Sequence, residues 1–172
     1  GLVSRTSNLS KQQFNKMFGM NGYKHSVLFA LSGSNFRISY KKSKNVKVFT
    51  MNTRVEGTLD HDDYTNFING HDLVSNSDLV ICKCGYGVIS ECLTSGIPFY
   101  YIVDDEHIEQ KSISHELERM GLTNRITLND INDIILSEDK LESLKSLHKP
   151  NDITNIVNKL IEFIKNWIIV LT

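Results

Sequence analysis

The hydrophobic pattern of the chain alternates short apolar runs of strand length with longer segments of helical spacing. Strands covered on both faces are apolar throughout, so the short runs predict buried parallel strands. These runs are residues 26–31, 46–50, 79–82 and 99–103. The helix-like segments are residues 9–18, 71–77, 88–95, 108–120, 130–136, 138–147 and 152–167. The alternation predicts an α/β fold, a Rossmann-like three-layer α/β/α domain with a mostly parallel sheet.

Weaker patterns fill the gaps between these elements. Residues 36–45 are short and Lys-rich, so the first crossover is expected to hold a brief helix or none. The polar residues 51–63 predict a surface loop, with His61, Asp62 and Asp63 in a solvated turn rather than a metal site. Residues 64–68 and 124–128 predict two short strands, and Asn129 is a plausible N-cap for the helix after it.

The stretch from Asp78 to Gln110 is the most informative part of the sequence. Gly85-Tyr86-Gly87 follows an apolar strand and opens a helix, and Gly96 is placed to end that helix in the left-handed conformation. Unpaired N–H groups at a helix N-terminus carry a partial positive charge, which suits a diphosphate. Glu91 follows one turn later, where its carboxylate can bind two neighbouring hydroxyls of a ribose. The alternative is that Glu91 only complements the helix dipole.

A second glycine-containing loop follows the first predicted strand. Its residues Gly33, Ser34 and Asn35 offer backbone and hydroxyl donors at the carboxyl end of that strand. Such a loop can bind phosphate, but Gly-Ser-Asn is also ordinary turn chemistry.

The segment after residue 103 carries three acids and a histidine, Asp104 to His107. A catalytic carboxylate pair is one reading. We favour the other, in which the acids are solvated and cap the helix beginning at Ile108. Glu109 and Gln110 lie in the first turn of that helix, where they can face an open cleft. His107 and His115 are more typical of surface histidines than of catalysts.

These residues resemble a known family. Asp78, Gly85, Glu91, Gly96 and Pro98, followed by Glu109-Gln110, are similar to the C-terminal domain of GT-B glycosyltransferases. The nearest group is the one that includes the lipid II-forming N-acetylglucosaminyltransferase of peptidoglycan synthesis, glycosyltransferase family 28. The resemblance covers most of the chain and is strongest over residues 78–121.

The resemblance implies a UDP-sugar site and the role of each matching residue. The residue matching Glu91 holds the ribose, the turn matching Tyr86, Gly87 and Val88 caps the diphosphate, and the loop of Gly33, Ser34 and Asn35 faces it. The backbone near Ile68 and Asn69 contacts uracil, and Glu109 and Gln110 contact the sugar. Two departures are Val88, where the family commonly has a hydroxyl residue, and Glu109, where it has glutamine.

The resemblance also divides the chain. Residues 1–23 are expected to be an interdomain linker and a short helix, and residues 24–172 a nucleotide-sugar-binding Rossmann-like domain. The chain is too short for both domains of a GT-B enzyme, so we expect an excised fragment or a natural half-enzyme. The acceptor and the general base would then belong to a missing N-terminal domain or a separate subunit.

The distribution of charge and the number of cysteines narrow the possible partners and the cellular compartment of the protein. Residues 1–55 carry ten of the 19 Lys and Arg and no Asp or Glu, although the net charge is only −1. This basic third suits a docking or peripheral membrane face, or is a solvated surface. No nucleic-acid motif accompanies it, so we expect no nucleic-acid partner. Three cysteines without a disulfide pattern predict a cytoplasmic protein with buried thiols, and neither a cofactor nor a metal is expected.

The leading hypothesis is therefore the donor-binding domain of a glycosyltransferase that uses a UDP-sugar, with UDP-N-acetylhexosamine first among donors. Alternatives are a nucleotide-sugar hydrolase or 2-epimerase on the same scaffold, which would need a base such as His107 or Asp104. A third hypothesis is a non-catalytic nucleotide-binding module. A dinucleotide site is disfavoured, because the first strand lacks G-x-G-x-x-G.

Overall fold

The computed structural model describes residues 7–31, 36–55, 62–63, 69–122, 124–147, 158–159 and 161–162. Gly33, Ser34, Asn35 and Ile68, the strand predicted at 64–68 and most of the helix predicted at 152–167 lie outside these residues.

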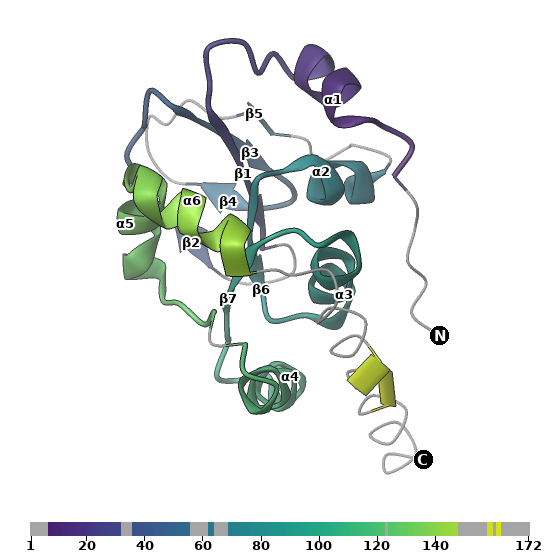
Figure 1. Cartoon of the computed structure of the whole chain (residues 1–172). Helices are drawn as coiled ribbons and strands as arrows, with labels where there is room; N and C mark the ends of the chain where they lie inside the picture. Colours follow the sequence, from purple (N-terminus) through teal and green to yellow (C-terminus); the bar gives the residue numbers. More distant parts are fainter. Residues whose placement is uncertain are drawn as a thin grey trace.

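A parallel sheet forms the centre of the domain (Figure 1). Its strands are β1 (His25–Ala30), β3 (Val46–Thr50), β5 (Asp62–Asp63), β6 (Leu79–Lys83) and β7 (Phe99–Ile102). Their order is β5-β3-β1-β6-β7, and all four pairings are parallel. A separate parallel pair joins β2 (Arg37–Ile38) to β4 (Arg54–Val55). The predicted α/β class with a mostly parallel sheet is confirmed.

Helices cover both faces of the sheet (Figure 1). One face packs against α1 (Lys11–Met17), α2 (Gly70–Asn76), α3 (Tyr86–Ser95) and α4 (Ile108–Arg119). The other packs against α5 (Ile131–Leu136) and α6 (Glu138–Leu147). Alternate residues of β1 point into the two hydrophobic cores. Leu28 packs on the α1–α4 side of the sheet, and Phe29 packs on the α5–α6 side. This is the three-layer arrangement that the apolar runs predicted.

The predicted elements agree with the structure to within one or two residues over β1, β3, β6, β7 and α1 to α6. Gly96 ends α3 in the left-handed conformation, with φ +66°, as predicted. In the described residues 36–45 between β1 and β3 the chain forms a two-residue strand and no helix, in keeping with the expected short crossover.

Three local predictions were wrong. The loop predicted at 51–63 includes β4 and β5, and Asp62–Asp63 pairs with Phe49 and Thr50 at the sheet edge, where polar side chains do not prevent backbone pairing. The strand predicted at 124–128 is a single bridge between Arg125 and Tyr101, followed by a 3-10 turn, η1 (Leu128–Asp130). The cap at this turn is Thr127, paired with Asp130 in a capping box, and not Asn129.

The strand order contains one reversal, and it lies between β1 and β6. The chain proceeds from β1 outward to β3 and β5, then returns to pair β6 on the other side of β1. The connections leaving β1 and β6 therefore diverge at the carboxyl edge of the sheet. Ligands of open α/β sheets bind at this kind of crevice.

Candidate functional site

The N-terminus of α3 lies at the carboxyl edge, directly after β6. The Cys84 N–H donates to the Ile102 carbonyl (2.8 Å), which keeps the turn in register with β7. Gly85 is the N-cap in an extended conformation, and no side chain caps the helix. The Ile89 N–H donates to the Gly85 carbonyl (3.2 Å). The earlier N–H groups of Tyr86, Gly87 and Val88 precede this first helical bond and are oriented for an anion.

The glycines of this turn are not required by the backbone. Gly85 has φ −113°, and Gly87 is not among the residues with positive φ. A Cβ on Gly87 would meet no heavy atom within 4 Å, and a Cβ on Gly85 would lie 3.5 Å from Lys83 Cε. The fold thus leaves open space in front of Gly87, which is what a ligand approaching the backbone needs.

Glu91 follows Gly87 by four residues, so the two lie on the same side of α3. The Glu91 side chain is half-buried, and its carboxylate makes no hydrogen bond or ion pair with any described residue. The first turn of α3 contains no acid, so Glu91 lies beyond the range of the strong helix-dipole interaction. This placement weakens the explanation of Glu91 by the helix dipole alone.

Helix α4 presents a second uncapped N-terminus after β7. Its N-cap is His107, which makes no side-chain capping bond. Asp104 Oδ1 accepts from the Glu106 N–H (3.1 Å), within the loop itself, so this carboxylate does not cap α4 by a hydrogen bond, and the predicted effect of the acidic charges on the helix dipole stays a prediction. Asp104 Oδ2 lies 3.6 Å from His107 Nε2, which makes an Asp-His pair at the edge of the sheet.

Glu109 and Gln110 differ in their surroundings. Glu109 is exposed in the first turn of α4, as predicted. Gln110 is only 7% exposed, and its Oε1 accepts from the Asp104 N–H (3.0 Å). The expectation that Gln110 faces an open cleft is corrected: its amide oxygen holds the loop that begins at Asp104, because the extended chain turns back over the first turn of α4.

Sequence reasoning missed Lys83. It is the last residue of β6, half-buried, with its Cε beside Gly85. Its ammonium group has no ion-pair partner among the described residues. A cation before a glycine turn at the end of an apolar strand is the signal that could have revealed it, because no buried strand needs a lysine there.

The three cysteines do not line the carboxyl edge of the sheet. Cys82, Cys84 and Cys92 are free and buried in the core between the sheet and α3. Burial raises the pKa of all three thiols, that of Cys84 to about 12, so they are neutral at physiological pH. Among the residues that the structure describes, no group of three His, Cys, Asp or Glu side chains is arranged to hold a metal ion.

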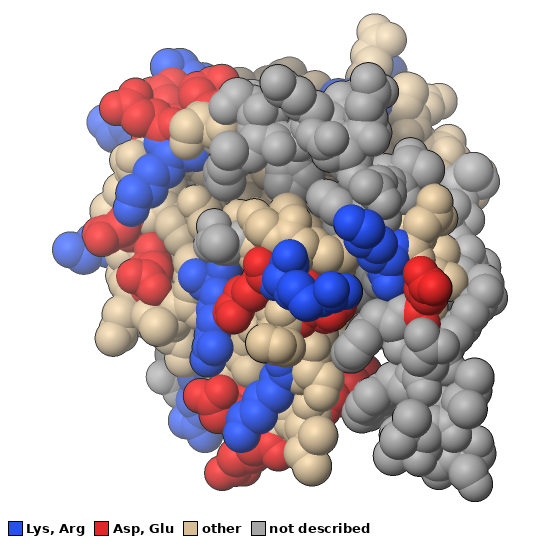
Figure 2. Space-filling view, turned by 60° about the horizontal axis from the view of Figure 1, so that its bottom comes forward, with Lys and Arg blue, Asp and Glu red and all other residues tan. Residues whose placement is uncertain are grey.

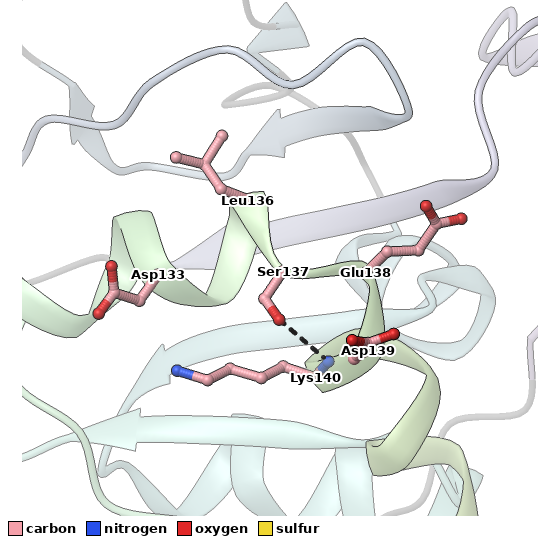
Figure 3. Close-up of a pocket in the computed structure, with 6 residues that line it drawn as sticks. All are labelled: Asp133, Leu136, Ser137, Glu138, Asp139 and Lys140. Atoms are coloured by element: carbon pink, nitrogen blue, oxygen red, sulfur yellow. Dashed lines mark hydrogen bonds between the residues drawn. The ribbon is translucent and has the colours of Figure 1, made fainter.

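A hollow of about 530 Å³ lies elsewhere, at the junction of α5 and α6 (Figure 3). Three of its lining residues are acidic and one is basic: Asp133, Leu136, Ser137, Glu138, Asp139 and Lys140. The Ser137 hydroxyl accepts from the Lys140 N–H (3.3 Å), which is an ordinary helix N-cap. Glu138 also pairs with Lys24, next to the start of β1, so the hollow lies near the amino edge of the sheet. Its charge and location do not suit a diphosphate.

Charges are mixed on the surface that comes forward in Figure 2. Lys and Arg side chains alternate there with Asp and Glu among the described residues. No helix in the described part of the chain is long and apolar enough to cross a membrane.

Comparison with known families decides the identity. The model of the glycosyltransferase family 28 C-terminal domain matches residues 22–165. The chain belongs to this family. No curated protein sequence matches it.

Two solved structures show the same fold. The glycosyltransferase of kitacinnamycin is 16% identical, with a TM-score of 0.50 over 85% of this chain and 40% of its own. The glycosyltransferase SnogD from Streptomyces nogalater is 10% identical, with a TM-score of 0.52 over 84% and 44%. This family 28 domain thus spans less than half the length of these enzymes, and its architecture is that of the C-terminal half of a GT-B fold.

Proposed function

We propose that this family 28 domain binds the donor of a glycosyltransferase that transfers a hexose or N-acetylhexosamine from a UDP-sugar to an acceptor hydroxyl. One observation carries the proposal. The N-terminus of α3, open at Gly87, lies on the same helix face as the Glu91 carboxylate, which makes no hydrogen bond or ion pair with the residues that the structure describes.

In this proposal the diphosphate lies against the N–H groups of Tyr86, Gly87 and Val88, with Lys83 as a nearby cation. These donors are fixed before the ligand arrives, and they would stabilise the negative charge of UDP as it leaves the sugar. The loop of Gly33, Ser34 and Asn35 is assigned to the other side of the diphosphate.

The remaining groups bind the two ends of the donor. Glu91 accepts hydrogen bonds from the two ribose hydroxyls, and the backbone at Ile68 and Asn69 contacts the base. Glu109 accepts from sugar hydroxyls, since an ionised carboxylate cannot donate. Gln110 is not assigned to the sugar, because its side chain is buried and its amide oxygen holds the Asp104 N–H.

The acceptor and the general base belong, in this account, to an N-terminal domain or a partner subunit. The domain alone should therefore bind donor and transfer little or no sugar. We place the assembled enzyme in the cytoplasm, with peripheral contact at the cytoplasmic face of the membrane through the basic N-terminal third.

A nucleotide-sugar hydrolase or 2-epimerase is the second candidate, favoured by the Asp104–His107 pair at 3.6 Å. Such a dyad could activate water beside the sugar. Release of UDP from a UDP-sugar in the absence of any acceptor would identify a hydrolase, and its loss in His107→Gln would assign the base.

Calorimetric titration with UDP, a UDP-sugar and ADP-ribose tests the main proposal. Saturable binding of UDP and the UDP-sugar, at least about tenfold tighter than ADP-ribose, is expected, which corresponds to about 1.4 kcal/mol. Absence of saturable UDP binding at millimolar concentration would contradict it.

A further inference from the structure

Asp72 joins the N-terminal segment of the described chain to the start of α2. Its Oδ1 accepts from the Ser7 hydroxyl and from the Asn8 N–H, both at 2.8 Å. Its Oδ2 accepts from the Asn69 side-chain amide at 2.7 Å. This buried carboxylate thus binds a backbone N–H that lies 64 positions before it in the sequence.

The contact is reinforced along α2. The Asn76 side-chain amide donates to the Ser7 hydroxyl (3.3 Å) and to the Leu9 carbonyl (3.2 Å). Lys11 donates to the Asn76 carbonyl and to Asp78 Oδ1. Burial raises the pKa of Asp72, but the hydrogen bonds from Ser7, Asn8 and Asn69 outweigh it and hold that pKa below its ordinary value. Asp72 is therefore ionised at neutral pH, and residues 7–11 lie against α2 beside its ribbon in Figure 1.

Asn69 places this contact at the ligand-binding edge. It precedes Gly70, where a Cβ would lie 2.7 Å from Met51 Sδ. Met51 directly follows β3 and bonds to the Phe29 carbonyl, so Asn69 lies at the carboxyl edge of the sheet. The Asn69 side chain makes no capping bond to α2 and is held by Asp72 instead.

We infer that Asp72 is a positioning residue that couples nucleotide binding at Asn69 to the packing of residues 7–9 on α2. This inference rests on the proposed function, in which the Asn69 backbone contacts the base. Asp72 does not touch the nucleotide. It fixes Asn69 and the N-terminal segment as one unit, so a nucleoside diphosphate that orders Asn69 also orders Ser7 and Asn8. Coupling between two sites is reciprocal, so loosening the segment must weaken nucleotide binding.

The test measures UDP and inorganic pyrophosphate affinities for the wild-type chain, Asp72→Ala and Ser7→Ala, with Asp105→Ala as a control for loss of an exposed acid. Asp72→Ala should weaken UDP at least about fivefold and leave pyrophosphate within about twofold, since pyrophosphate lacks the base. A purely structural role would weaken both ligands alike. Ser7→Ala removes one hydrogen-bond donor to Asp72 from outside the site and should lower the affinity for UDP about twofold or more. This variant still tests the inference if Asp72→Ala does not fold.

Amide hydrogen exchange supplies the second measurement. UDP should slow exchange at Asn8 in the wild-type chain at least about threefold and not in Ser7→Ala or Asp72→Ala. A wild-type chain that binds UDP without slowing exchange at Asn8, or variants with unchanged UDP affinity, would overturn the inference alone. A wild-type chain that does not bind UDP would instead overturn the proposed function.

Discussion

Gly87 and Glu91 lie one helical turn apart on the same side of α3. At Gly87 there is open space in front of the backbone N–H groups of the helix N-terminus. The Glu91 carboxylate has no partner among the described residues. A Cβ on Gly87 would meet no heavy atom within 4 Å, and Glu91 lies beyond the first turn, where the helix dipole favours an acid most. Together they provide an anion site and a hydroxyl acceptor on one rigid element, and substitutions can separate the two.

Gly87→Ala should weaken binding without harming the fold. The added methyl group meets no protein atom, and Ala favours helix over Gly, so the melting temperature should stay the same or rise. The methyl group occupies the space assigned to the diphosphate, so the affinity for UDP and for pyrophosphate should fall about tenfold, as for loss of one hydrogen bond to a charged group. Calorimetry and thermal melts measure the two effects.

Thr94→Ala is the matched control for this substitution. Thr94 is exposed near the other end of α3, and its hydroxyl donates to the Ser90 and Glu91 carbonyls of its own helix. It should leave UDP affinity unchanged. Equal affinities of Gly87→Ala and the wild-type chain for pyrophosphate would contradict the assignment of the diphosphate to this turn.

Glu109→Gln should change the binding of the sugar without changing the binding of the nucleotide. Glu109 is exposed at the uncapped start of α4 and is assigned to the sugar alone. We expect unchanged affinity for UDP and a change of about threefold or more in the affinity for UDP-N-acetylglucosamine, since glutamine can also donate. A parallel change in both ligands would remove Glu109 from the sugar site.

Asp78 should make the free energy of unfolding depend on pH in the acidic range. It lies at the amino edge, where its Oδ2 accepts from the Ser26 N–H (2.8 Å) and its Oδ1 pairs with Lys11 (3.0 Å). Burial raises its pKa, but Lys11 and the Ser26 bonds lower it more, so the net pKa is below its ordinary value. The stabilisation is present above the ordinary pKa and is lost as pH falls through the depressed one.

Asp78→Asn should therefore lower the free energy of unfolding at pH 7 by about 2 kcal/mol. The difference from wild type should begin to shrink below about pH 4, where the carboxyl of the unfolded chain takes up a proton, and it should disappear once the pH has fallen through the depressed pKa of the folded state. Urea denaturation at several pH values gives both numbers. A difference that stays constant from pH 7 to pH 2 would mean that the charge of Asp78 is not involved.

The three thiols should be unreactive in the folded protein. Burial raises the pKa of each, that of Cys84 to about 12, and only the thiolate attacks disulfide reagents. An aromatic disulfide reagent should label none of them within minutes in buffer and all three in concentrated urea. Fast labelling of one thiol in buffer would show that the core between β6 and α3 opens readily.

The sequence was most informative where local pattern and tertiary environment agree. Buried parallel strands are continuous apolar runs, so β1, β3, β6 and β7 could be located to within one or two residues. The turn at Gly85 and the cap at Gly96 follow from residue type in the same way. Glu91 was identified as a ligand candidate, and its carboxylate has no partner within the described part of the chain, which agrees with that expectation without testing it.

Predictions failed where a distant contact decides the outcome. Asp62–Asp63 joins the sheet although both residues favour turns, because it pairs in parallel with Phe49 and Thr50 of β3. Gln110 turns inward because the Asp104 N–H needs an acceptor, which the linear sequence cannot reveal. Lys83 was overlooked because its importance depends on its distance from Gly85 in space.

Comparison of UDP binding by the wild-type chain and by Glu91→Gln tests the central claim most directly, with Asp139→Asn as a control that removes an exposed acid of α6. Glutamine keeps the shape of the side chain and removes its charge, so the melting temperature should not change. We predict at least a tenfold loss of UDP affinity, as for charge-assisted hydrogen bonds to two hydroxyls of about 1.5–3 kcal/mol, with pyrophosphate affinity unchanged. Equal UDP affinities of Glu91→Gln and the wild-type chain would contradict the claim that α3 holds the ribose of the donor through Glu91.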